Sequence, residues 1–305
     1  MRMALWPRNN RGYVLVIVMG LLAALSVMAL SLGAATRADL EQARRFQDEA
    51  AAELLSRAAI EWAMHYLSTA ERQGTLWQVP WYSQSPTFQA RPLGAGTFDV
   101  RYSDASGALH DGLQDEEGRI NLNTAPATLL AALPGVGQEL AAAMVTQRQQ
   151  QPWSVPEEVL QRGLVTASLW YGSAEKPGLS AYFTVWGSGK INVNTASPVI
   201  LGTLPGITPA MVQAIMRYRQ GDDQRLGTAD DRYFRALTDL STLKEIDRHA
   251  LERFGDLLTV TPSAFRCIAT GRVPSSAGQA SVHQRLVVLE RTANVTALRY
   301  WRRLD

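Results

Sequence analysis

The chain has 305 residues, of which 19% are charged, and its formal net charge at pH 7 is +2. This length accommodates a membrane helix together with one large or two small globular domains. So small a net charge excludes the broad basic field that non-specific nucleic-acid binding requires. The single cysteine, Cys267, excludes an intrachain disulfide, and its place in an apolar run predicts a buried thiol.

A short basic leader, residues 1–12, precedes an uncharged stretch at residues 13–36. About 20 apolar residues in a helix cross the hydrocarbon core of a bilayer, so this stretch is long enough to span a membrane. Because the positive charges lie before the span, we expect a cytoplasmic N-terminus. An uncleaved signal anchor, or a secretory signal cut near Ala34 and Ala35, stays open as an alternative, although the apolar stretch is longer than such a signal needs.

Apolar residues continue at helical spacing from residue 37 to about Leu67, with charged residues between them. A basic leader that ends in glycine, followed by one long helix, resembles a type IV prepilin. That resemblance implies cleavage between Gly12 and Tyr13 by prepilin peptidase, and N-methylation of Tyr13. The family carries a glutamate five residues into the mature chain, where this chain has Ile17. A tip subunit has no neighbour above it to pair with that glutamate, so Ile17 favours a tip position; the alternative is a lipid-facing residue in a protein that is not a pilin.

Residues 37–112 are predicted to hold the periplasmic part of the helix and the first part of a sheet, because Thr97–Tyr102 alternates like a strand. Residues 261–305 contain three further strand-like runs. They are Ala264–Thr270, Ser281–Glu290 and Thr296–Trp301. A long helix packed on an antiparallel sheet is an α+β arrangement, and we predict a type IV pilin-like fold.

Two segments between these strands, copy one (118–148) and copy two (189–219), repeat one pattern without gaps. Each is predicted to be a helix-hairpin-helix unit whose helices are separated by Pro-Gly. We expect Asn123 or Thr124, and in copy two Asn194 or Thr195, to cap the first helix. Residues 113–260 are therefore predicted to form a large all-α insertion within the sheet. The matched positions include Gly118/Gly189, Asn121/Asn192, Asn123/Asn194, Thr124/Thr195, Pro134/Pro205 and Arg148/Arg219.

Helix-hairpin-helix units often bind DNA through a phosphate at a helix N-terminus. Copy one keeps two hairpin glycines, in the run 135–137, whereas copy two has only Gly206. Cations after the hairpins are few, namely Arg148, Arg217 and Arg219, whereas phosphate binding usually needs several per site. The units therefore favour protein packing, and we do not expect DNA as a partner.

An acidic loop follows copy two. Its carboxylates are Asp222, Asp223, Asp230 and Asp231. Calcium takes six to eight oxygen ligands, and four carboxylates in a glycine-hinged loop predict a Ca²⁺ site. The alternative is a solvated loop that Arg225 and Arg232 neutralise. No nucleophile–base pair, phosphate loop or regular metal-ligand spacing stands out, so we assign no catalytic residues and expect no enzyme.

Taken in this order, the leader, the split sheet, the two repeats, the acidic loop and the ending from Phe265 to Arg303 resemble the K-type minor pseudopilin of type II (general) secretion systems. The resemblance implies a bacterial inner-membrane protein with one span, a cytoplasmic N-terminus and a periplasmic C-terminal domain. It implies a complex with minor pseudopilins I and J at the tip of the pseudopilus, which primes assembly and supports export of folded proteins across the outer membrane. Further implied partners are the other pseudopilins, prepilin peptidase, and the secretin or the secreted substrates.

Members of that family bind Ca²⁺, which adds to the case for the acidic loop. Two other functions stay open. The repeated module also resembles that of membrane-anchored DNA receptors used in DNA uptake. The other open function is that of a minor pilin of a true type IV pilus.

Overall fold

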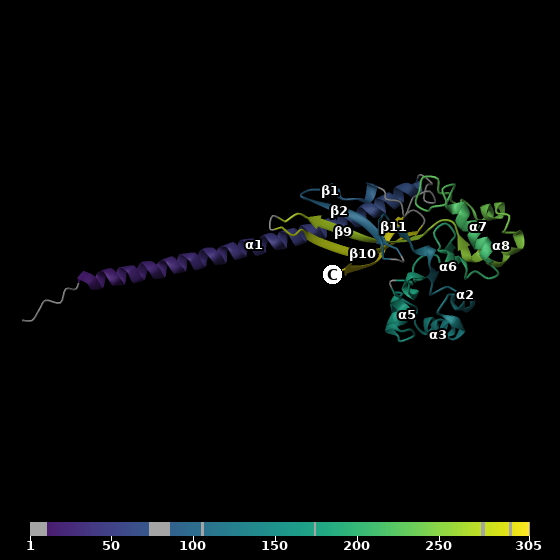
Figure 1. The fold of residues 1–305 in the computed structure, drawn as a ribbon, viewed down its shortest axis with the longest axis horizontal. Helices are drawn as coiled ribbons and strands as arrows, with labels where there is room; N and C mark the ends of the chain where they lie inside the picture. Colours follow the sequence, from purple (N-terminus) through teal and green to yellow (C-terminus); the bar gives the residue numbers. More distant parts are fainter. Residues whose placement is uncertain are drawn as a thin grey trace, which may run out of the picture. The chain divides into compact units, whose positions relative to one another are not determined.

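The computed structural model describes residues 11–72, 86–104, 107–173, 175–275, 278–292 and 295–304. Most of the predicted leader therefore lies outside the described residues. The chain divides into two compact units, Met1–Ala50 and Ala51–Asp305, which we describe separately. One helix, α1 (Arg11–Arg72), runs through both (Figure 1).

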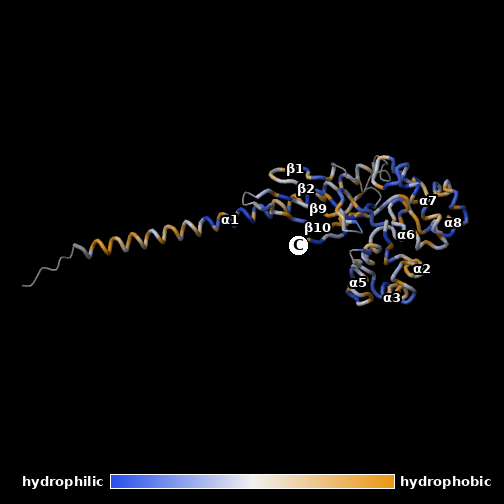
Figure 2. Tube along the Cα trace, viewed as in Figure 1, coloured by the Kyte–Doolittle hydropathy of each residue, from blue (hydrophilic) through white to orange (hydrophobic). Residues whose placement is uncertain are grey.

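In the first unit, α1 is long and apolar enough to cross a membrane, and its most apolar 18-residue window has a mean hydropathy of 2.6. The tube is mostly orange with pale turns over this part of α1, and it becomes blue where the charged residues begin (Figure 2). Its side chains are exposed, as a lipid-facing helix requires. The hydroxyls of Ser26, Ser31 and Thr36 each donate to a backbone carbonyl three or four residues earlier, so these polar groups are satisfied without water.

In the second unit, α1 buries one stripe of mostly small residues at helical spacing. The stripe consists of Ala52, Leu55, Ser56, Ala59, Ile60, Ala63, Leu67 and Ala70. The small side chains allow the helix to lie very close to the sheet. A Cβ at Gly271 would come within 2.1 Å of the Ala52 carbonyl oxygen, so only glycine fits at this crossing.

The sheet is antiparallel, with strand order β1-β2-β9-β10-β11, while β3 pairs with β2 and β4 pairs with β9. The strands are β1 (Arg91–Leu93), β2 (Gly96–Ser103), β3 (Leu109–Asp111), β4 (Gln114–Asp115), β9 (Ala264–Val273), β10 (Ser281–Thr292) and β11 (Val295–Leu304). All four predicted strands are confirmed, each one to three residues longer at one or both ends. The long helix and the antiparallel sheet are likewise present as predicted.

The core between α1 and the sheet contains the buried stripe of α1 and apolar residues of β2, β9 and β10. Cys267 is fully buried in this core, as predicted. Burial raises the pKa of Cys267 to about 12, so at neutral pH the thiol stays protonated and is a poor nucleophile.

Residues between β4 and β9 form the predicted insertion. Its helices are α2 (Ala127–Ala131), α3 (Gly137–Gln150), α4 (Glu158–Gln161), α5 (Ala167–Tyr171), α6 (Pro198–Leu201), α7 (Pro209–Arg219) and α8 (Arg248–Phe254). The description of the insertion as all-α is wrong in one respect, since it also holds two short parallel strand pairs. They are β5 (Ile120–Asn121) with β6 (Phe183–Thr184), and β7 (Ile191–Asn192) with β8 (Leu258–Thr259).

The boundaries of the insertion also differ slightly from 113–260, because Gln114 and Asp115 pair with Arg266 and Phe265 in the sheet. The insertion has a core of its own, separate from that of the sheet, to which both repeat copies contribute. Within the second unit its helices gather at one end of the sheet (Figure 1). The chain re-enters the sheet at Ala264, whereas Gly271, near the other end of β9, lies against Ala52.

Candidate functional site: the helix start, the repeats and the acidic junction

Gly12 and Tyr13, the predicted processing site, lie in the first turn of α1. The Tyr13 side chain is exposed, and so is Ile17. Cleavage between Gly12 and Tyr13 and methylation of Tyr13 stay predictions.

The two repeat copies contact each other reciprocally. A Cβ at Gly189 would come within 2.4 Å of Thr124 Oγ1, and a Cβ at Gly118 would come within 3.2 Å of Thr195 Oγ1. Gly118 corresponds to Gly189 in the repeat, and Thr124 corresponds to Thr195. The glycine of each copy therefore packs on the threonine of the other, and this exchange is the contact expected of two related units around an approximate two-fold axis.

The predicted helix caps are wrong, because Asn123 and Asn194, which occupy matching positions in the two copies, hold the chain that returns after the second helix. Asn123 Nδ2 donates to the Trp153 carbonyl and the Trp153 amide donates to Asn123 Oδ1, both at 2.9 Å. In copy two, Asn194 makes the same pair of hydrogen bonds with Phe234, also both at 2.9 Å. The actual N-cap of α2 is Pro126, which offers no side-chain acceptor, and the N-cap of α6 is Ser197.

Two arginines that we counted as candidate DNA contacts point into the repeats. Arg148 Nη1 donates to the carbonyls of Leu122 and Ala125, at 2.9 and 2.6 Å. Arg219 Nη1 donates at 2.6 Å to the carbonyl of Ala196, the residue that corresponds to Ala125. Both side chains satisfy backbone carbonyls and are not presented to a phosphate.

The remaining features of a phosphate site are weak in copy two. Arg217 pairs with Glu245 at 2.9 Å. At the start of α7, Thr208 Oγ1 accepts the Met211 amide, and Pro209 has no amide hydrogen. These groups are thus engaged within the protein, and the expectation that the repeats do not bind DNA stays a prediction.

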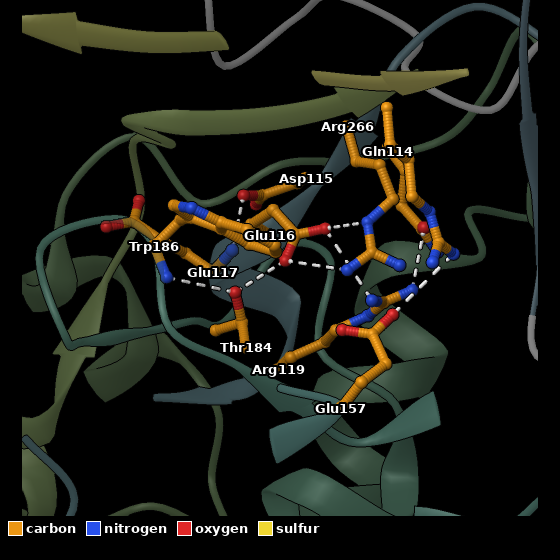
Figure 3. Close-up of polar contacts among 10 residues, drawn as sticks. Gln114, Asp115, Glu116, Glu117, Arg119, Glu157, Thr184, Trp186 and Arg266 are labelled. Carbon is orange, nitrogen blue, oxygen red and sulfur yellow. Dashed lines mark hydrogen bonds and ion pairs between the residues drawn. The ribbon is translucent and has the colours of Figure 1, made fainter. Parts of the chain in front are cut away.

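Three consecutive buried carboxylates, Asp115, Glu116 and Glu117, lie where β4 enters the insertion (Figure 3). We name them the acidic junction. Asp115 Oδ2 accepts from Asn192 Nδ2 at 2.7 Å and from Thr195 Oγ1 at 2.6 Å. The junction therefore joins the sheet to the start of copy two.

Glu117 joins two further segments. Its Oε1 accepts the Ser188 amide at 2.7 Å and the Ser263 hydroxyl at 2.8 Å, and its Oε2 accepts the Ser263 amide at 2.7 Å. Ser188 precedes copy two, and Ser263 precedes β9. One carboxylate thus fixes both the segment between the copies and the return into the sheet.

Glu116 forms the charged part of the junction. Its Oε1 lies 2.6 Å from Arg266 Nε and 3.6 Å from Arg119 Nη1, and its Oε2 accepts from Thr184 Oγ1. Burial works to raise the pKa of Glu116, but Arg266 and Arg119 hold it below its ordinary value. The carboxylate is therefore ionised in the fold.

Asp115 behaves in the opposite way. Burial raises the pKa of Asp115 to about 7, and the nearby Glu117 carboxylate adds to the rise. Its hydrogen bonds from Thr195, the Glu117 amide and Asn192 lower the pKa but do not outweigh burial. The pKa values of Asp115 and Glu116, two neighbouring carboxylates, are thus shifted in opposite directions by their surroundings.

The acidic loop closes on itself. Asp230 Oδ2 accepts the amides of Asp222 and Asp223, at 2.6 and 3.0 Å, and Asp231 Oδ2 accepts the Gly227 amide at 2.8 Å. Arg232 pairs with Asp222 at 2.7 Å. Among the described residues no three acidic, histidine or cysteine side chains are grouped to hold a metal ion, and Ca²⁺ binding here stays a prediction.

The sequence reasoning missed the acidic junction and its arginines, Arg119 and Arg266. A signal was present, since three acidic residues precede Gly118 directly at the start of copy one. Their partners could not be read from it. Glu116 pairs with Arg266, 150 positions further along the chain.

Two family models match segments of the insertion. Residues 120–181 match the family model of the type II secretion system (T2SS), protein K, and residues 187–259 match the helix-hairpin-helix motif. The two matched segments nearly coincide with the two strand-bounded halves of the insertion, β5 to β6 and β7 to β8. No curated protein matches the chain.

Among solved structures, the fold is similar to a chain in the GspK-GspI-GspJ complex from the type 2 secretion system of enterotoxigenic Escherichia coli. The TM-score is 0.50 at 15% sequence identity, and the match covers 88% of this chain and 99% of that chain. Fold and family model therefore confirm that this chain is similar to the K-type minor pseudopilins of type II secretion systems.

Proposed function

We propose that the chain is a minor pseudopilin at the tip of a type II secretion pseudopilus, built on a pilin-like core. The observation that carries the proposal is the place of the insertion. It leaves and re-enters the sheet beside the first residues of β9, while the last residues of β9 lie against Ala52, where α1 enters the second unit. Bulk at that end of the sheet blocks the stacking of a further subunit, so the subunit is terminal.

The partners that we propose are minor pseudopilins I and J. A structurally similar chain was solved in a complex named GspK-GspI-GspJ, and this match covers most of both chains. The apolar part of α1 is the surface that we expect to associate within the membrane, and Leu22, at its middle, is 58% exposed. A tip complex of this kind primes assembly of the pseudopilus and supports export of folded proteins.

Processing gives the first test. We expect mass spectrometry to find N-methylated Tyr13 as the mature N-terminus in cells with prepilin peptidase, and an intact Met1 in cells without it. The variant Gly12→Asp should keep its leader in both strains. A cut near Ala35 that does not need the peptidase would remove the pilin assignment.

The membrane helix gives the second test. Leu22→Asp places a charge near the middle of the span, which costs about 3 kcal/mol on insertion scales. We expect this variant to lose membrane partition or co-purification with I and J, and secretion to fall accordingly. Leu22→Ala, the matched control, keeps an uncharged helix and should secrete normally; normal secretion by Leu22→Asp would contradict the proposal.

Two other functions are separated by simple readouts. A DNA receptor requires salt-dependent DNA binding, which we do not expect, because Arg148 and Arg219 bind backbone carbonyls. If the chain is a minor pilin of a type IV pilus, cells without it would lose twitching or adhesion. If it is a type II pseudopilin, cells without it would lose protein export.

A further inference from the structure

A pocket of about 450 Å³ opens in the second unit where the first repeat copy meets the sheet. Its lining includes Arg119, Glu157, Trp170, Tyr171, Arg266 and Arg302. The first four belong to the insertion, whereas Arg266 lies on β9 and Arg302 lies on β11. The pocket therefore draws its charged groups from segments that only the tertiary fold brings together.

Three buried donors around this pocket have no hydrogen-bond acceptor among the described residues. They are Arg119 Nη1, Arg266 Nε and Trp170 Nε1. The two guanidinium atoms lie near Glu116 Oε1, at 3.6 and 2.6 Å, but without hydrogen-bond geometry. Arg119 is 7% exposed and Trp170 is 1% exposed, and both residues line the pocket. The two guanidinium groups therefore have a charged partner in Glu116, whereas Trp170 Nε1 has no hydrogen-bond acceptor among the described residues. A buried donor without an acceptor costs about 1–3 kcal/mol, which an acceptor-only ligand would recover.

The charges at the pocket balance, and Arg302 has the longest ion pair. Arg119, Arg266 and Arg302 line it with Glu157 and Asp104. Glu116 pairs with Arg119 and Arg266, whereas Arg302 has only the 3.7 Å contact with Glu157 among the ion pairs of the described residues. Asp104 Oδ2 lies 2.7 Å from His110 Nε2. Burial and the neighbouring Arg266 lower the pKa of Arg119 to about 10, which means that the surroundings disfavour its positive charge despite Glu116.

Glu157 pairs with Arg302 in the pocket lining. Its Oε1 lies 3.7 Å from Arg302 Nη2, and the two side chains are 32% and 49% exposed. Figure 3 places the Glu157 carboxylate beside the Arg119 guanidinium. An ion pair so long and so exposed contributes little to stability, so another carboxylate can replace Glu157 at low cost.

We propose that this pocket binds a carboxylate group, held by Arg119, Arg266 and Arg302 with Trp170 as a further donor. Guanidinium forks bind carboxylates through paired, charge-assisted hydrogen bonds, and a carboxylate offers only acceptors. The aromatic wall of Trp170 and Tyr171 accommodates the apolar stem that carries the carboxylate. The carboxylate comes either from a free organic acid or from an acidic side chain of a polypeptide.

Calorimetric titration of the full chain in detergent micelles tests the proposal, with succinate and a triglutamate peptide as probes and sodium chloride at matched ionic strength as the reference. We expect at least one probe to bind. Arg302→Gln should weaken that binding about five- to tenfold, because it removes one charge-assisted contact. Glu157→Gln should strengthen it, because it removes the competing carboxylate.

Arg299→Gln is the matched control. Arg299 lies on the same strand and is as exposed as Arg302, but it pairs with Glu290 and does not line the pocket. The affinity of the Arg299→Gln variant should stay within about twofold of the parent affinity, a smaller change than the loss of one charge-assisted hydrogen bond causes. Binding of the peptide alone would assign the carboxylate to a polypeptide, and binding of succinate would extend it to free acids. If neither probe binds, or if Arg302→Gln and Arg299→Gln behave alike, the proposal is overturned.

Discussion

The two copies of the repeat share one set of internal contacts but attach to the rest of the molecule differently. In both, the second asparagine of the motif holds the returning chain, and the last arginine binds carbonyls at the start of the unit. In copy one, however, Asn121 Nδ2 donates to the backbone carbonyl of Trp186, whereas in copy two Asn192 Nδ2 donates to the buried carboxylate of Asp115. The two copies thus share the hydrogen bonds within each unit and differ in the hydrogen bond that attaches each unit to the rest of the protein.

The hairpins and the return paths differ as well. Copy one turns with Gly135 and Gly137 in the left-handed region, whereas copy two replaces the second glycine by Thr208, which caps α7. From the final arginine to the residue held by asparagine, copy one takes 5 residues (Arg148 to Trp153) and copy two takes 15 (Arg219 to Phe234). The acidic loop occupies this extra length. Copy two therefore carries both the anchor to the sheet and the additional loop.

The largest expected effect comes from the asparagine that holds the returning chain. Asn194 is 2% exposed and bonds three backbone groups, of Phe234 and Val260, whereas Asn123 is only half-buried. We expect Asn194→Ala to lower the free energy of unfolding by about 3 kcal/mol, and Asn123→Ala by about 1–2 kcal/mol, because truncation leaves buried backbone groups unpaired. Urea unfolding of the full chain in detergent, followed by circular dichroism, measures both. Equal losses would show that the two copies are equally buried in solution.

The reciprocal glycine contacts predict a second unequal pair. Gly189 has φ +86° and lies against Thr124, so Gly189→Ala combines a left-handed alanine with a steric overlap. We expect a loss of about 2–3 kcal/mol. Gly118→Ala meets Thr195 at a milder 3.2 Å and should cost less than about 1 kcal/mol. The same unfolding measurement applies, and a costlier Gly118→Ala would contradict the described contact between the copies.

The anchor of copy two predicts a pH dependence that copy one lacks. Burial raises the pKa of Asp115 to about 7, above its value of about 4 in the unfolded chain, so the folded state binds this proton more tightly. The contribution of Asp115 to stability is therefore present at low pH and is lost as pH rises from about 4 to about 7.

Asp115→Asn removes this titration. Relative to that variant, the parent should lose stability between pH 5 and pH 8, as measured by urea unfolding at both values. Asp256→Asn, at an exposed carboxylate, is the control and should follow the parent. In the parent and in the variant alike, the Glu116 contribution to stability has the opposite pH dependence. Because the pKa of Glu116 is lowered in the fold, this contribution is present above the ordinary glutamate pKa and is lost as pH falls. A parallel pH profile for Asp115→Asn and the parent would refute the assignment.

The smallest effect is expected at the acidic loop. We propose that Ca²⁺ binds there and stabilises the fold by about 1 kcal/mol or less, because the loop is exposed and its carboxylates already accept amide hydrogens. Thermal unfolding with Ca²⁺ and with a chelator should differ for the parent and coincide for Asp223→Asn. Calorimetry without Ca²⁺ heat, together with unchanged melting after chelation, would sink the idea.

Several features of this protein could be predicted from the sequence because their signals are local. The uncharged span, the continuing helical spacing and the alternation of the strands each follow from residues close together in the chain, and α1, β2, β9, β10 and β11 all appear where expected. The repeat was visible for the same reason, as was the burial of Cys267 within an apolar strand.

Only the tertiary structure decided what the polar residues of those elements do. Asn123 and Asn194 fit the pattern of helix caps, yet they bind chain segments 30 and 40 residues away. Glu117 reaches Ser263, 146 residues away, and Arg302 meets Glu157 across the fold. Local sequence determines which segments become helices and strands because backbone periodicity is a short-range property. The partner of a buried polar group depends instead on which distant segments the hydrophobic cores bring together, and no local pattern records that.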